Sequence, residues 1–362
     1  MNISSYNITD VSYHYIGLRV LGNLTAEAGR TVQVKEISRN VLKFVTDRAL
    51  RLMLPQPSGT FAGTGQKICQ ELMHFNFARP AGRGYELTEN GRSILGLLNS
   101  QEFKSLRLLM AGIHIETYEN LRRIVERHIQ SGPVWRPVVE AARMSDVKYI
   151  EKSFLPTFGS RAKSEATRVL SEHRGLSRGR LQDVMHELII GEILPDQRIK
   201  VANFRAICDR LVSLRLLNQR RLTSDGCEFT VSYSPCTYLP TDRTWYVPLE
   251  VSLGNGGVFR LFYCEPDMDD HQQQDILLDT IDRAFFELIA EGGYYDLPDL
   301  RDWVCQELMI PDAAFDDGVN HLLDRYPPVL SVGLHYDRVT AMRRPLVRRR
   351  RSVEIHNLIR RL

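Results

Sequence analysis

The chain of 362 residues lacks the marks of a membrane or secreted protein. No stretch approaches the roughly 18 consecutive apolar residues that a membrane span needs. The N-terminal sequence MNISSYNITD has neither the basic nor the apolar region of a signal peptide. The six cysteines are scattered and form no CxxC pair, as expected of reduced thiols rather than disulfides. We therefore expect a cytoplasmic protein that makes no contact with a membrane.

Basic residues are almost absent from the segment 265–324. It holds 17 acidic residues and two arginines, which gives a net charge of −15. The segment 325–362 holds 10 arginines and two acidic residues, a net charge of +8, so the total of +3 leaves +10 for residues 1–264. Because charges of opposite sign attract different molecules, we expect the basic and acidic parts to have different partners.

The sequence also lacks a phosphate-binding loop of the Walker A type. Such a loop needs Gly-Lys-Ser/Thr, so that backbone amides and the lysine converge on phosphates. In the glycine-rich stretch 59–67, Gln66 separates Gly65 from Lys67, and Ile68 stands where the hydroxyl residue is required. We interpret this stretch as a turn into a helix.

Metal and nuclease motifs are incomplete as well. A nuclease core needs an acidic residue and then Glu-x-Lys on a strand, but Ser252 stands at the lysine position after Glu250. The histidines form no HxH or HExxH motif. Two weaker groups, an acidic one in a linker and a thiol one on strands, have no standard ligand spacing: Asp267, Asp269, Asp270 and His271, and Cys227, Cys236 and Cys264. We predict no catalytic residue, metal or cofactor.

What the sequence does contain is a helix followed by a hairpin over residues 203–234. The helical spacing of the apolar residues predicts one buried stripe, with Arg215 and Asn218 facing outward. Arg220 and Arg221 follow the helix, and a Ser-Asp-Gly turn then precedes a segment in which apolar residues alternate with polar ones, as in a strand. The apolar stripe consists of Phe204, Ile207, Leu211, Leu214 and Leu217.

This arrangement resembles the recognition helix and wing of a winged-helix domain. A similar pattern occurs upstream over 65–98, where Tyr-Glu-Leu-Thr at 85–88 resembles the exit from a wing into a helix. A third occurs downstream, with a helix over 315–325 and a hairpin over 329–336. The resemblance is to the superfamily and covers about two thirds of the chain.

The expected fold is mainly α with β-wings, an α+β class of three tandem winged-helix-like modules joined by a long helix. The first module, with a connector helix over 101–130, spans 1–130. The second spans 131–264 and has an extended β-wing, because Gly-Asn-Gly-Gly at 254–257 separates two strand-like runs. The acidic third module spans 265–337, and 338–362 is a basic tail.

The winged-helix resemblance implies contact with double-stranded DNA, with the recognition helix in the major groove and the wing on phosphate. Amide and guanidinium side chains at those positions suit base edges and phosphates. The alternative is that these arginines are merely solvated. The expected DNA-binding residues are Thr64, Gln66, Lys67, Gln70, Arg79 and Arg83 in the first module, Asn203, Arg205, Arg215, Arg220 and Arg221 in the second, and Arg348, Arg349, Arg350 and Arg351 in the tail.

The third module is expected to bind protein instead. Its helix carries Asp316, Asp317 and Asp324 without a lysine and would repel DNA. The tail places Ile355, Leu358, Ile359 and Leu362 at amphipathic helical spacing after its arginines. It would contact DNA, act as a solubilising end, or bind the acidic module.

We expect a non-enzymatic DNA-binding protein, the recognition or assembly subunit of a bacterial genome-maintenance or phage-defence complex. A multi-module layout fits an assembly subunit better than a compact repressor, and the long helix leaves homo-oligomer formation open. An adaptor whose modules all bind protein is the alternative, and a metal-dependent nuclease is the third possibility.

Overall fold

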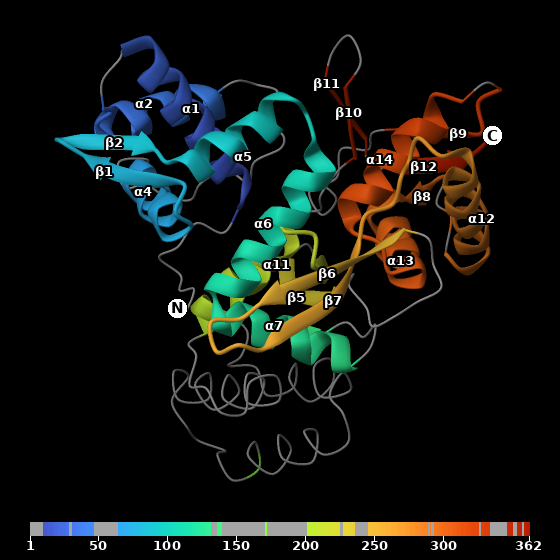
Figure 1. The fold of residues 1–362 in the computed structure, drawn as a ribbon. Helices are drawn as coiled ribbons and strands as arrows, with labels where there is room; N and C mark the ends of the chain where they lie inside the picture. Colours follow the sequence, from blue (N-terminus) through green and yellow to red (C-terminus); the bar gives the residue numbers. More distant parts are fainter. Residues whose placement is uncertain are drawn as a thin grey trace. The chain divides into compact units, whose positions relative to one another are not determined.

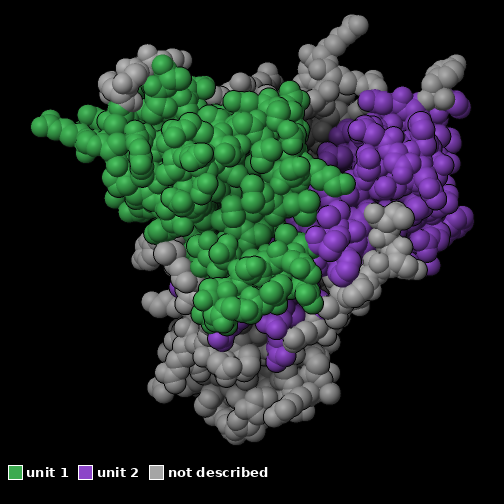
Figure 2. Space-filling model, viewed as in Figure 1, with its two compact units in different colours: residues 1–122, 209–214, 249–260 green, residues 123–208, 215–248, 261–362 purple. Residues whose placement is uncertain are grey.

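The computed structural model describes two compact units (Figures 1 and 2). Unit 1 comprises 1–122, 209–214 and 249–260, and unit 2 comprises 123–208, 215–248 and 261–362. Within them the described residues are 10–28, 31–46, 64–131, 136–139, 171, 201–224, 227–235, 245–288, 290, 293–325, 327–333, 346–349, 353–356 and 358–362. The fold is mainly helical with small antiparallel sheets, which confirms the α+β class. None of the described helices is long and apolar enough to cross a membrane.

Unit 1 contains the N-terminal array of helices and a hairpin. Val32 forms an antiparallel bridge with Tyr85, which belongs to the second strand of the hairpin, Gly84–Leu87. This strand therefore lies between Val32 and the first strand of the hairpin, Ala78–Ala81. The helix expected after the glycine-rich stretch 59–67 is present as α4 (Thr64–His74). In chain order the elements are α1 (Ser12–Ala28), Val32, α2 (Val34–Thr46), α4 (Thr64–His74), β1 (Ala78–Ala81), β2 (Gly84–Leu87) and α5 (Glu89–Asn99).

The start of α5 shows why the sequence at 85–92 takes this form. The hydroxyl of Thr88 accepts a hydrogen bond from the amide of Gly91 at 3.1 Å and so caps the helix. A Cβ at Gly91 would lie 2.0 Å from the carbonyl oxygen of Phe77, so only glycine fits this close approach of helix and chain.

The single long helix predicted over 101–130 is wrong. The chain forms α6 (Phe103–Thr117) and α7 (Glu119–Ser131), separated by Tyr118 in an extended conformation. Tyr118 is fully buried, and its ring lies edge-on to Phe75 at 5.9 Å between centroids. Burying this ring explains the break, which the uninterrupted apolar spacing does not indicate.

The middle array contains α11 (Val201–Ser213) and a three-stranded sheet in the order β3-β5-β4. The helix ends at Ser213, well before Arg220, because Arg215 takes a left-handed conformation with φ of 59°. The sheet strands are β3 (Arg136–Val139), β4 (Leu217–Ser224) and β5 (Cys227–Pro235). The predicted second hairpin is confirmed as β6 (Tyr246–Ser252) and β7 (Val258–Cys264).

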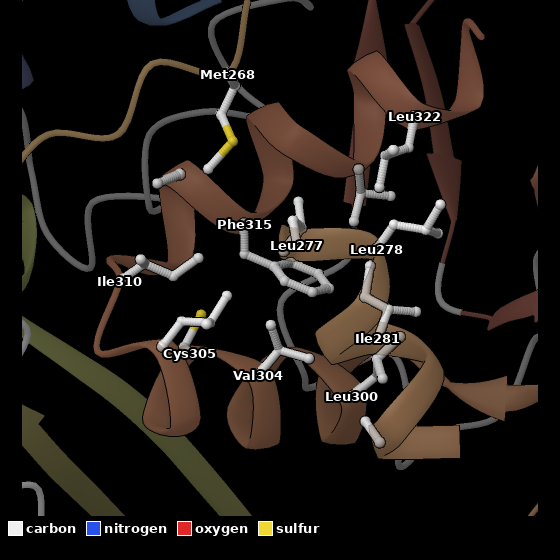
Figure 3. Packing of buried hydrophobic residues seen from close by; sticks show 14 of the residues in the cluster. Met268, Leu277, Leu278, Ile281, Leu300, Val304, Cys305, Ile310, Phe315 and Leu322 are labelled. Carbon is white, nitrogen blue, oxygen red and sulfur yellow. The ribbon is translucent and has the colours of Figure 1, made fainter. Parts of the chain in front are cut away.

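The C-terminal array lies in unit 2 and is built on three helices and a sheet in the order β8-β12-β9. Leu277, Ile281 and Phe315 point into one apolar core (Figure 3). A Cβ at Gly318 would lie 2.3 Å from Cδ2 of Leu277, so α12 and α14 approach closely. The elements are α12 (His271–Glu287), β8 (Tyr295–Asp296), α13 (Leu297–Leu308), α14 (Asp312–Leu323), β9 (Leu330–Gly333) and β12 (Leu358–Arg361).

The amphipathic helix predicted near the C-terminus is wrong. Residues 353–356 form β11 (Val353–His356), which pairs with β10 (Leu346–Arg349) as a separate two-stranded sheet. Strand β12 is the central strand of the C-terminal sheet, and Ile359 is fully buried in the core. Strand β9 lies within the hairpin predicted at 329–336 and pairs with β12, whereas residues 334–336 lie outside the described residues. The end of the chain is therefore part of a folded sheet.

One chain order recurs in all three arrays. A helix precedes a first strand, one or more helices follow it, and two further strands complete a sheet in which the last strand is central. In the middle and C-terminal arrays the first strands are β3 and β8, and the central strands are β5 and β12. In the N-terminal array the isolated bridge residue Val32 stands in place of a first strand, and β2 lies between it and β1.

Candidate nucleic-acid interface

Helix α4 presents one polar stripe. Gln66 and Gln70 are exposed, four residues apart, and His74 continues the same stripe one turn later. Lys67 is half-buried beside it. Thr64 begins the helix, and its side chain lies outside the described set. The structure thus places the two predicted glutamines together on an open helix face, and adds His74, which the sequence reasoning missed.

The hairpin β1–β2 follows this helix and carries the two predicted arginines. The guanidinium of Arg79 pairs with the carboxylate of Glu86 on the opposite strand at 2.6 Å, and the two side chains are 67% and 34% exposed. Arg83 is exposed beside Gly82, which takes a positive φ at the turn. Arg79 must therefore exchange a carboxylate for a phosphate in order to bind DNA.

Behind the polar stripe, the opposite face of α4 carries a buried ionic cluster. Nη2 of Arg210, from α11, donates to Oε1 and Oε2 of Glu71 at 3.1 and 2.9 Å. Nε2 of His14, from α1, lies 2.6 Å from Oε2 of the same carboxylate. Nη1 of Arg210 lies 3.0 Å from Nε2 of His114 on α6. The four side chains are at most 2% exposed, and together they join four helices of unit 1 at one point.

The protonation state of this cluster follows from its geometry. Burial acts to raise the pKa of Glu71, but its partners His14 and Arg210 outweigh burial and hold the pKa well below its ordinary value. Burial, and then the charge of Arg210, lower the pKa of His114 well below 6.5. His114 is therefore neutral, with its Nδ1–H donating to the carbonyl of Met110 at 2.7 Å and Nε2 accepting from Arg210.

The predicted residues of the middle array do not form an open helix face. Every described side chain of α11 is buried or half-buried, including Asn203. Arg215, predicted to face outward, is 19% exposed and lies 3.8 Å from both Glu265 and Asp317. Arg220 and Arg221 belong to β4 rather than to a helix end. The side chains of Arg205, Arg220 and Arg221 lie outside the described set.

Asn218, also predicted to face outward, is buried on β4. Its Nδ2 donates to the carbonyl of Ile310 at 2.7 Å, and its Oδ1 accepts from the amide of Asp312 at 2.9 Å. The hydroxyl of Tyr246 donates to the carbonyl of Met309 at 3.1 Å. These bonds fasten the turn between α13 and α14, so the N-terminus of α14 is covered within unit 2.

The acidic residues of α14 are also partnered. Asp316 pairs with the buried Arg301 at 2.8 Å, and Asp317 lies near Arg215. Strand β10, with Arg348 and Arg349, lies beside α14. The side chains of these two arginines, and the whole of Arg350 and Arg351, lie outside the described residues.

The weaker catalytic and metal candidates have structural partners. Glu250 pairs with Arg260 across the β6–β7 hairpin at 2.8 Å. Asp270 accepts from the amide of Gln272 at 2.9 Å and caps α12. Cys264 is a buried free thiol. Residues 59–63, Cys236 and the side chain of Cys227 lie outside the described part. Among the described residues, no three His, Cys, Asp or Glu side chains are grouped as a metal site would require.

Comparisons of the chain with models of known protein families, with curated proteins and with solved structures give no match.

Proposed function

We propose that this chain is a non-enzymatic subunit built from three winged-helix modules, and that its N-terminal module binds double-stranded DNA. The observation that carries the proposal is the recurrence of one order of helices and strands. The last strand lies between the strand before it and either a first strand or, in the N-terminal array, the bridge residue Val32. In a winged helix the helix before the hairpin enters the major groove, and the hairpin lies against phosphate. By position these helices are α4, α11 and α14.

The N-terminal module is the best suited of the three for DNA. Its helix α4 has an exposed polar stripe, whereas α11 is covered along its described length and α14 is fastened at its N-terminus. Amide groups such as those of Gln66 and Gln70 can pair with adenine in the major groove. Arg83 lies at the hairpin turn, where a positive charge would meet the backbone.

The remaining predicted arginines have a secondary role in this proposal. Arg348 and Arg349 lie on β10, so in this proposal they belong to the β10–β11 hairpin of the C-terminal module rather than to a free tail. The same binding assays test whether this hairpin contacts DNA.

An adaptor function is the second candidate. It is favoured by the packing of the described residues of α11, and of the N-terminus of α14, inside the chain. In that case the acidic region 265–324 would bind a partner protein, or a second copy of the chain, and duplex DNA would not bind.

Fluorescence anisotropy with a labelled duplex at graded salt concentrations tests the proposal. If about four phosphates are neutralised, log affinity should fall with log salt at a slope of roughly −3.6. Arg83→Glu should weaken binding to every sequence, whereas Lys104→Glu, the same charge change at an exposed position on α6, should have little effect. Gln66→Ala and Gln70→Ala should alter sequence preference with the salt slope unchanged. No duplex binding by the intact chain would favour the adaptor.

A further inference from the structure

The outer face of α12 is exposed to solvent along the length of the helix. Exposed residues recur at intervals of three and four along the whole helix, opposite the buried face that carries Leu277 and Ile281. We call these exposed and half-buried residues the outer stripe: Gln272, Asp275, Ile276, Asp279, Asp282, Arg283, Phe286 and Glu287.

The outer stripe combines apolar ends with an acidic centre. Phe286 is 90% exposed and Ile276 is 37% exposed. Ten residues of helix separate them, which corresponds to about 15 Å along the axis. Burial of an aromatic ring is favourable, but the ring of Phe286 buries almost none of its surface within the array. It is therefore available for packing against another molecule.

The charges of the stripe already attract guanidinium groups. Asp275 pairs with Arg325 at 2.8 Å, and Asp282 pairs with Arg361 at 3.1 Å. The one arginine of the stripe, Arg283, is directed to Glu307 at 3.3 Å on α13. Asp279 is exposed between the two paired aspartates, and Glu287 is exposed next to Phe286. A cationic partner therefore complements this surface, and an anionic one such as DNA does not.

We propose that the outer stripe of α12 docks a cationic amphipathic helix of a partner protein, with Phe286 as its main apolar anchor. The inference rests on the proposed function only in taking this chain to be an assembly subunit. Two packed helices bring apolar side chains together at spacings of three, four, seven, ten and eleven residues. The partner helix would thus carry two apolar contacts about ten residues apart, with lysine or arginine between them.

The test uses the full-length chain and an 18-residue fluorescent peptide of leucine, alanine and lysine, with the leucines along one helical stripe. A second peptide has glutamate at each lysine position. Phe286→Ser is compared with Phe103→Ser, a matched change at a 44% exposed phenylalanine of unit 1. Glu287→Gln is compared with Glu116→Gln, which is exposed on α6. Duplex binding and molar mass by light scattering are measured on the same samples.

The lysine peptide should bind, and the glutamate peptide should not. Phe286→Ser should weaken peptide binding by about tenfold or more, because it removes the aromatic anchor. Phe103→Ser should weaken it by less than about twofold. Equal binding to all variants, or no binding, overturns the docking site whether or not the duplex binds. A dimer of the intact chain that Phe286→Ser dissociates would also overturn it, because the occupant would then be a second copy. Loss of duplex binding alone contradicts only the proposed DNA contact.

Discussion

Replacing Arg210 with methionine should destabilise unit 1 far more than the loss of an ordinary ion pair. The substitution leaves the carboxylate of Glu71, 2% exposed, without the guanidinium that donates to both of its oxygens. Breaking a buried pair by removing one partner costs about 3–5 kcal/mol. After the change, His14 is the one partner of the buried carboxylate that this cluster retains. Glu71→Leu leaves the buried guanidinium of Arg210 without its carboxylate partner and should lower the stability of unit 1 by a similar amount.

The double variant, Arg210→Met with Glu71→Leu, should recover most of this loss. Apolar residues of similar volume often replace a buried pair at a cost of about 0–1 kcal/mol. If each single change costs at least about 3 kcal/mol and the double change about 1, the interaction energy between the two sites is about 5 kcal/mol or more. The exposed pair Arg260 and Glu250, 72% and 60% exposed, is the control, and Arg260→Met should cost under about 1 kcal/mol.

Hydrogen exchange followed by mass spectrometry can measure these energies at α4 and α11 separately from the rest of the chain. Unit 1 contains no tryptophan, so the tryptophan fluorescence of unit 2 reports independently whether the rest of the protein stays folded. A cost below about 1 kcal/mol for Arg210→Met would refute the reasoning, since a fully desolvated pair cannot be lost so cheaply. A double variant as unstable as the sum of the single variants would refute the coupling.

Other predictions address pH, the hairpin and the last strand. Because the pKa of His114 is lowered in the folded state, the unfolded chain binds the extra proton, and the stability of unit 1 should fall as pH drops below 6.5. Urea titrations at several pH values should show a weaker fall for His114→Gln. Glu86→Gln removes a negative charge and frees Arg79, so duplex affinity should rise modestly in the anisotropy assay. Ending the chain before residue 358 removes the central strand and buried Ile359, so circular dichroism should show loss of the C-terminal array.

The elements that the sequence predicts well are those set by local patterns. The turn at 59–67 predicts the start of α4, and the glycine-rich turn at 254–257 predicts the β6–β7 hairpin. The Thr-x-x-Gly signal at 88–91 predicts the start of α5, and the cap is present. In each case the determining contacts lie within a few residues of one another along the chain.

The buried cluster was missed although a signal for it is present. Arg210 is three residues after Ile207 and four before Leu214, so it falls on the apolar stripe of its helix. Glu71 has the same relation to Ile68 and to Phe75. Charges of opposite sign on the buried faces of two helices predict a buried pair. Which helices meet is a matter of tertiary structure and is not contained in either pattern.

The errors at α11 and at the C-terminus have a common physical cause. Leu214 and Leu217 continue a helical spacing, but the chain leaves the helix at Ser213, and Asn218 instead binds the turn before α14. Leu358 and Ile359 fit a helical stripe equally well, but β12 pairs with β8 and β9, which are separated from it by many residues. Apolar spacing over so few residues does not distinguish a helix end from a strand when distant contacts decide.

The same contacts explain why one repeated order of elements would serve different purposes. A helix can read DNA only if one of its faces is free, and the face available differs among α4, α11 and α14. The buried face of α4 is held by Glu71 and Arg210, and Gln66 and Gln70 are exposed on its opposite face. In the C-terminal array the corresponding helix is fastened at its N-terminus, and the free face belongs to α12. The exposed faces of the two helices differ in charge. Polar and basic residues lie on α4 and the hairpin after it, whereas acidic residues lie along α12. A charge reversal confined to either face should therefore affect only the partner proposed for that face.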